Sequence, residues 1–228
     1  MTYVPDDVTS WPVFKPLIIA HDVGRSRDRS TAVVGGNSPC GRRLVGIREA
    51  EELPQGLFGH ARASALAAVD ARHHHNALIV ADLSNDATYA EVLVQTFGQR
   101  VIGLQISRYG DGMNADWRPV RHGHLPVYTI GRTYLIELFH TELQSDLVRF
   151  AEGPLRQAYD QLANLELEYR DSGAVYTCPP GKHDDLAISC AMLAWAARHL
   201  HLETWLRNLE AARKPRRPRQ RGGWAAHT

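Results

Sequence analysis

The chain has 228 residues, enough for one well-packed domain and not clearly enough for two. Its 44% of hydrophobic and 22% of charged residues are typical of a globular protein, and no apolar run is long enough for a membrane-spanning helix. The net charge of +1 is close to neutral, so the overall charge of the chain does not indicate a nucleic-acid-binding protein. Residues 1–14 are expected to be a loose polar leader without the pattern of a signal peptide, so a cytoplasmic location is expected.

Three short strands are expected near the start of the chain. Residues 16–23 contain the apolar run Leu-Ile-Ile-Ala and lead into His-Asp-Val-Gly, which is typical of a strand followed by a turn. Residues 30–36 and 43–48 predict two further strands. The polar loops between these strands are short, which favours antiparallel pairing.

A strand–helix–strand unit is expected next. Residues 57–69 have apolar side chains at helical spacing, and residues 77–81 are apolar throughout, as in a strand buried on both faces. This strand ends at Asp82. A second amphipathic helix at 89–97 and a strand at 100–106 follow, and the connection predicts that the two strands are parallel.

The remainder of the chain is predicted to be mainly helical. The polar, Gly-rich residues 107–124 are expected to form a long irregular loop, a kind of segment that is often functional. Helices are expected at 135–147, from Pro154 to Leu165 and at 184–200, with a short extended piece at Val175. Residues 15–205 are therefore expected to form one domain.

The C-terminal residues 206–228 form a basic tail that includes Arg-Lys-Pro-Arg-Arg-Pro-Arg-Gln-Arg at 213–221. Such a segment has no apolar surface to bury, and disorder is expected. Two interpretations remain open. The tail is either simply solvated or an arm that contacts phosphates and adds salt-sensitive, sequence-independent affinity.

Together the strands predict an α/β fold with a mixed five-stranded sheet flanked by helices, three strands being antiparallel and two belonging to a parallel unit. This order is that of the ribonuclease H-like fold. Asp22 and Asp82 end the first and fourth strands, and they would lie side by side if these strands are neighbours. Asp184 and Asp185 open the last helix, where acidic residues also suit the helix dipole.

Carboxylates that converge in apolar surroundings repel one another, and divalent cations with a preference for oxygen, such as Mg²⁺ or Mn²⁺, remove that repulsion. Two such ions, about 3.5–4 Å apart, activate water and stabilise the departing oxygen of a phosphodiester. Taken singly, each acid has a simpler interpretation, namely a turn at Asp22, a cap at Asp82, and a helix N-cap at Asp184 or Asp185. Their combination, in the order that the fold requires, favours a two-metal nuclease site.

Neighbouring histidines and basic residues have open interpretations. His183 precedes the acidic pair and either contacts metal, orients water or binds phosphate, or is simply a residue at a helix start. His21 precedes Asp22, and the alternation of a strand is expected to point its side chain to the opposite face. Arg108, Arg118, Arg121 and Lys182 are candidates for a DNA groove, and a solvated loop fits each of them equally well.

At these residues the chain resembles the nuclease domain of phage large terminases, a branch of the ribonuclease H-like superfamily. The matching segments are 18–24, 77–98, 132–150 and 182–187, and the resemblance spans roughly residues 15–200. The most specific segment is Lys-His-Asp-Asp-Leu-Ala at 182–187, which opens an Ala-rich helix.

This resemblance implies a metal-dependent endonuclease, encoded by a phage or prophage, that cuts concatemeric double-stranded DNA during packaging. The implied location is the cytoplasm of the host cell. Carried over residue by residue, Asp22 and Asp82 are the first two acids, and Asp185 is favoured over Asp184 as the third. The implied partners are double-stranded DNA and, on separate chains, an ATPase motor, a small terminase or a portal protein.

Two departures from the family pattern bear on these expectations. The sequence Leu-Ser-Asn-Asp at 83–86 replaces a Gly-rich segment after the second acid, and no phosphate-binding loop of an ATPase is present. The chain is therefore interpreted as an isolated nuclease domain or a stand-alone relative that does not translocate DNA by itself. A junction resolvase or another ribonuclease H-like nuclease, and a non-catalytic DNA-binding or assembly module, remain alternative hypotheses.

Overall fold

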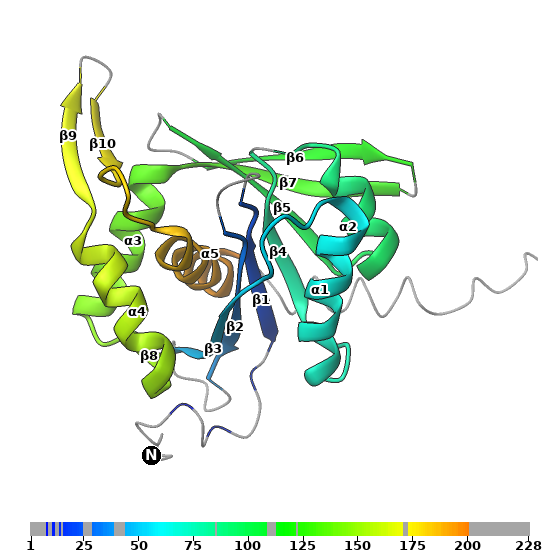
Figure 1. Ribbon diagram of the computed structural model, residues 1–228, viewed down its shortest axis with the longest axis horizontal. Coiled ribbons are helices and arrows are strands. Elements are labelled where there is room, and N and C mark those ends of the chain that lie inside the picture. Colours follow the sequence, from blue (N-terminus) through cyan, green and yellow to red (C-terminus); the bar gives the residue numbers. More distant parts are fainter. Residues whose placement is uncertain are drawn as a thin grey trace, which may run out of the picture.

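A mixed eight-stranded sheet organises the molecule, in the order β6-β7-β5-β4-β1-β2-β3-β8, and helices cover both of its faces (Figure 1). The computed structural model describes Val8, Trp11, Phe14 and residues 16–24, 29–38, 44–84, 86–108, 113–121, 123–170 and 173–200.

The central strands agree with the sequence-based predictions. β1 (Leu17–Asp22), β2 (Thr31–Asn37) and β3 (Val45–Glu52) form an antiparallel meander. β4 (Leu78–Asp82) pairs in parallel with β1 on one side and with β5 (Val101–Ser107) on the other. The predicted combination of an antiparallel unit with a parallel unit is confirmed.

The predicted number of five strands is wrong, because the main sheet has eight. β6 (Met113–Val120) and β7 (Gly123–Gly131) form a hairpin. β6 lies within the expected irregular loop at 107–124, and most of β7 lies in residues for which no element was predicted. β8 (Val148–Phe150) extends the opposite edge. β6 contains Pro119 and has weak alternation, which an edge strand tolerates but which hides it from pattern analysis. β8 has only three residues, too few for any periodicity.

Helices α1 (Gly59–Arg72) and α2 (Tyr89–Phe97) cover one face of the sheet, and α3 (Arg132–Gln144), α4 (Glu152–Ala163) and α5 (Asp185–His199) lie on the other side (Figure 1). β9 (Glu166–Arg170) and β10 (Gly173–Thr177) form a separate antiparallel pair that projects beside α3 (Figure 1). No helix within the described ranges combines the length and apolar character needed to cross a membrane.

The core has two layers because the side chains of β1 alternate. Ile18 and Ala20 belong to the apolar cluster that contains α5, whereas Ile19 belongs to the cluster that contains α1 and α2. α5 is buried continuously from Leu186 to Ala197, since it packs against the sheet on one side and against α3 and α4 on the other. This packing fixes where the first turn of α5 meets the ends of β1 and β2.

The described residues of the expected leader are buried. Val8, Trp11 and Phe14 form a small apolar cluster with Leu44, so this part of residues 1–14 packs against the domain. The basic tail at 206–228 lies outside the described residues, and its disorder stays a prediction.

Candidate active site

The parallel pairing of β1 and β4 brings two of the predicted acids together. His21 lies opposite Ala81 in the register, and one residue further each strand ends at its aspartate, Asp22 or Asp82. Both aspartates line a cavity of about 380 Å³. The condition that these strands are neighbours is thus met.

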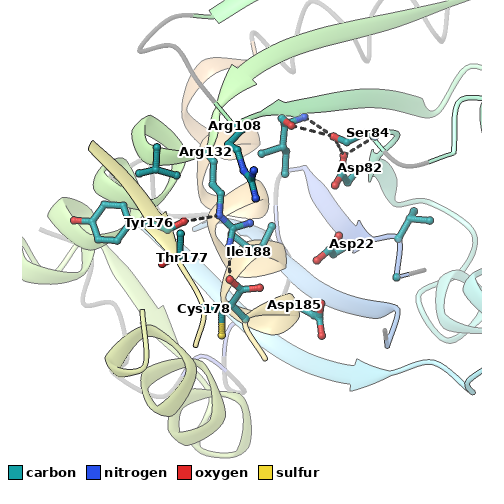
Figure 2. Close-up of a pocket in the computed structure, with 15 residues that line it drawn as sticks. Asp22, Asp82, Ser84, Arg108, Arg132, Tyr176, Thr177, Cys178, Asp185 and Ile188 are labelled. Carbon is teal, nitrogen blue, oxygen red and sulfur yellow. Dashed lines mark hydrogen bonds and ion pairs between the residues drawn. The ribbon is translucent and has the colours of Figure 1, made fainter. Parts of the chain in front are cut away.

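The start of α5 supplies the other two acids. Asp184 is the N-cap residue and Asp185 the first residue of the helix, and both line the same cavity. The carboxylate of Asp184 is bound by the guanidinium of Arg132, whose Nε also donates to the carbonyl oxygen of Tyr176 at 3.2 Å. Asp82 is in turn bound by Ser84, and Figure 2 shows these hydrogen bonds as dashed lines.

Burial is the main influence on the pKa values of the two strand-end acids. Burial raises the pKa of Asp22 well above its usual value, and the charges of Asp82, Asp185 and Asp184 raise it further, in part offset by Arg132. Burial also raises the pKa of Asp82, while hydrogen bonds from Ser84 lower it. The Ser84 backbone N–H donates to Asp82 Oδ1 at 2.8 Å, and the Ser84 hydroxyl donates to the same oxygen.

Comparison with known proteins identifies the fold. No family model and no curated protein matches the sequence. The large terminase nuclease from the thermophilic phage G20c matches with a TM-score of 0.55 and 18% identity, over 80% of this chain and 84% of that chain. The chain has the fold of a large terminase nuclease domain.

Two further structures of this kind agree with that result. The G20c nuclease with bound magnesium has a TM-score of 0.54 and 19% identity, with 79% and 82% of the two chains covered. The nuclease domain of the Thermus phage P74-26 large terminase has a TM-score of 0.53 and 20% identity, with 80% and 82% covered. The predicted α/β, ribonuclease H-like fold class is confirmed.

The donor set of this cavity suits a hard divalent cation. Among the residues that the structure describes, no three His, Cys, Asp or Glu side chains are gathered closely enough to hold an ion as they stand. The chemistry nevertheless fits, because Asp22, Asp82 and Asp185 line one cavity with carboxylate oxygens, and burial together with the neighbouring charges raises the pKa of Asp22. Asp184 fits less well, since Arg132 already neutralises it.

Basic groups face the acids across the cavity. Arg108 and Arg132 both line it, and Figure 2 shows their side chains near its centre, opposite Asp22 and Asp82. Arg118, Arg121 and Lys182, the other candidates for a DNA groove, are not among its lining residues. His183 also lies outside the lining; its side chain is 54% exposed, with Nδ1 at 3.7 Å from Asp185 Oδ2.

Sequence reasoning missed several polar residues around the acids. Arg132 carried one usable signal, because a basic residue in the first turn of a helix opposes the helix dipole and needs another reason to be there. Ser189 carried another, since it is the one hydroxyl-bearing residue between Asp185 and Arg198 in an otherwise apolar segment. Ser84 gave no signal beyond its place after Asp82.

Proposed function

We propose that the chain is a divalent-metal-dependent nuclease that cuts DNA, with Asp22, Asp82 and Asp185 as ligands of Mg²⁺ or Mn²⁺. The observation that carries this proposal is the convergence of carboxylates from β1, β4 and α5 on one cavity, where burial and then their charges raise the pKa of Asp22. The magnesium bound to the G20c nuclease, which has a similar fold, supports the choice of ion.

Each group around the cavity has a role in this proposal. Ser84 donates two hydrogen bonds to one oxygen of Asp82, and these bonds fix the orientation of the Asp82 carboxylate. The guanidinium groups of Arg108 and Arg132 suit the phosphates of a DNA strand, because they offer paired donors and a permanent charge. Bound divalent ions would supply the activation of water and the stabilisation of the departing oxygen.

His183 and Asp184 have secondary roles. His183 stands beside Asp185 with Nδ1 3.7 Å from its carboxylate, where it can orient a water or take up a proton. Asp184 holds Arg132 in place instead of binding metal. We therefore assign the third ligand to Asp185.

The proposed substrate is double-stranded phage DNA, cut from concatemers during packaging. The support for this finer role is the similarity in fold to the large terminase nucleases of phages G20c and P74-26. An ATPase motor, a small terminase or a portal protein on separate chains would be the partners.

The cleavage test uses plasmid DNA, MnCl₂ and the full chain. We expect Asp22→Asn and Asp82→Asn to lower the cleavage rate by about 100-fold or more, because even partners of metal ligands contribute roughly 10–100-fold. Asp160→Asn changes an exposed aspartate on α4 and serves as the matched control with unchanged activity. Equal cleavage by the wild type and both site variants would show that these acids do not carry the reaction.

Calorimetric titration with Mn²⁺ separates the two acids of α5. We expect Asp185→Asn to weaken binding by about 100-fold and Asp184→Asn by about tenfold, the latter through the release of Arg132. The reverse order would make Asp184 the ligand. A non-catalytic DNA-binding module predicts no Mn²⁺ signal that depends on any of these carboxylates.

A further inference from the structure

A buried chain of hydrogen bonds joins the backbones of Asp22 and Asp185. The backbone N–H of Asp22 donates to Ser189 Oγ at 3.2 Å, and the Ser189 and Thr31 hydroxyls lie 2.6 Å apart. The Thr31 hydroxyl donates to the backbone carbonyl of Asp185 at 3.1 Å. Three elements, β1, β2 and α5, are thus tied together directly behind two of the proposed metal ligands.

The number of protons on the two hydroxyls fixes which group donates and which accepts in each of these hydrogen bonds. A hydroxyl has one proton to donate, and that of Thr31 goes to the Asp185 carbonyl. The Ser189 proton must therefore go to Thr31 Oγ1, while Ser189 Oγ accepts from the Asp22 N–H. Each hydroxyl donates once and accepts once, so the bridge has no unsatisfied member and one defined arrangement.

Local structure explains how the bridge is assembled. Ser189 follows Asp185 by four residues, so the two lie on the same face of α5, one turn apart. Thr31 is the first residue of β2 and lies opposite Asp22 in the strand register. Both residues are buried, with 0% exposure for Ser189 and 1% for Thr31, so the two hydroxyls form their hydrogen bonds with protein groups and not with bulk water.

We infer that Thr31 and Ser189 are positioning residues, whose two-hydroxyl bridge sets the separation of Asp22 and Asp185 and thereby the affinity of the site for its divalent ion. The inference rests on the proposed function, because it takes both carboxylates to act on the same ions. Two ionised carboxylates repel each other, and the bridge holds the first turn of α5 against the end of β1.

A hydrogen bond at the other end of β2 and α5 provides a matched control. Asn37, the last residue of β2, donates from Nδ2 to the carbonyl oxygen of Ala197 near the end of α5 at 3.0 Å. It links the same strand to the same helix as Thr31 does, but without contact to either acid. Asn37→Ala therefore loosens β2 from α5 where no metal ligand is affected.

The test is Mn²⁺ titration calorimetry on the full chain, with the melting temperature of each metal-free variant measured in parallel. Ser189→Ala and Thr31→Val are expected to weaken Mn²⁺ binding by about tenfold or more. Thr31→Ser keeps the hydroxyl and is expected to bind as the wild type does. Asn37→Ala is expected to lower the melting temperature while its Mn²⁺ affinity stays within about twofold of the wild type, well below that tenfold effect.

The outcomes separate the inference from the proposed function. Unchanged affinity in both hydroxyl variants, or an equal loss in Asn37→Ala or Thr31→Ser, overturns the bridge while the nuclease proposal stands. Absence of Mn²⁺ binding in the wild type overturns both. If Thr31→Val does not fold, Ser189→Ala gives the same comparison, because it removes one hydroxyl without adding volume.

Discussion

His21 and Asp22 are consecutive residues of β1, yet they lie in opposite environments. His21 is fully buried on the face covered by α1 and α2, where its Nδ1 donates to the carbonyl oxygen of Thr31 at 2.8 Å and its ring meets that of Tyr89 edge to face. Asp22 lines the cavity on the other face, among carboxylates. The imidazole of His21 is enclosed on one side of the strand, and several carboxylates gather on the other.

The face behind the cavity also contains a buried cation. Arg62 of α1 is 4% exposed, donates to the carbonyl oxygen of Gly24 at 3.0 Å and lies over the ring of Tyr89. Its guanidinium is 4.0 Å from Asp86, so it touches both the loop after β1 and the loop after β4. The comparison teaches that the polar groups on the α1 face are enclosed and hold the loops after β1 and β4, whereas the acids on the other face line a cavity.

The largest effect on this comparison is expected from Arg62→Met, which removes the cation behind the loops. We expect a loss of about 2–3 kcal/mol in the free energy of unfolding, because a buried hydrogen-bonded charge and its ring contact disappear while Asp86 stays partly solvated. Urea unfolding measures this loss.

Arg72→Met, on the same helix but with a half-exposed side chain paired to Glu51, is the control for Arg62→Met. It is expected to cost about 1 kcal/mol or less. Equal costs for the two arginines would contradict a supporting role for the α1 face.

A smaller effect is expected from His21→Gln, and it depends on pH. Burial lowers the pKa of His21 from 6.5 to about 4, so the unfolded chain binds more protons than the folded one between these values. The folded state of the wild type therefore loses stability as the pH falls through this window, by roughly 2 kcal/mol between pH 7 and pH 5. In His21→Gln this contribution is absent.

Urea unfolding at pH 7 and pH 5 tests the assignment to His21. The difference in pH dependence between His21→Gln and the wild type isolates the contribution of this side chain, since all other titrating groups are shared. His140→Gln, an exposed histidine on α3, is expected to keep the wild-type pH dependence. If the free energy of unfolding of His21→Gln changed between pH 7 and pH 5 as much as that of the wild type, the pH dependence would have to come from another group.

The sequence predicted those parts of the site that depend on local pattern. An apolar strand that ends at an aspartate is visible without a structure, as at Asp22 and Asp82, and strand alternation correctly placed His21 on the opposite face. From the sequence, the meeting of Asp22 and Asp82 was conditional on β1 and β4 being neighbours, and the structure meets that condition. The assignment of Asp22, Asp82, Asp184, Asp185 and His183 to catalysis or metal binding stays a prediction.

What the sequence did not predict depends on contacts between distant residues. Arg132 and Asp184 are separated by 52 positions, and Ser189 and Asp22 by 167, so neither pair has a local pattern that could announce it. The β6–β7 hairpin was missed for another reason. β7 pairs with β5, and β6 pairs with β7, which compensates for the weak strand character of residues 113–120. Tertiary pairing of this kind overrides local propensity.

The smallest effect, opposite in sign to that of His21→Gln, is expected from Asp22→Asn in the metal-free protein. The raised pKa of Asp22 means that the folded chain holds its proton more tightly than the unfolded chain, so ionisation destabilises the fold as the pH rises above the ordinary value of 3.8. At pH 7 with EDTA, we expect the asparagine variant to be more stable by on the order of 1 kcal/mol, or roughly 2–4 °C in melting temperature.

Addition of Mn²⁺ should reverse this order, because the ion stabilises the wild type through binding and gives little to Asp22→Asn. Thermal unfolding with EDTA and with MnCl₂ measures both effects on the same samples. A lower melting temperature for the metal-free variant would mean that Asp22 contributes to the fold as His21 does. The contrast between the two faces of β1 would then be one of burial only. A higher melting temperature, lost on addition of Mn²⁺, would show that the acidic face is kept at a cost in stability that its ligand removes.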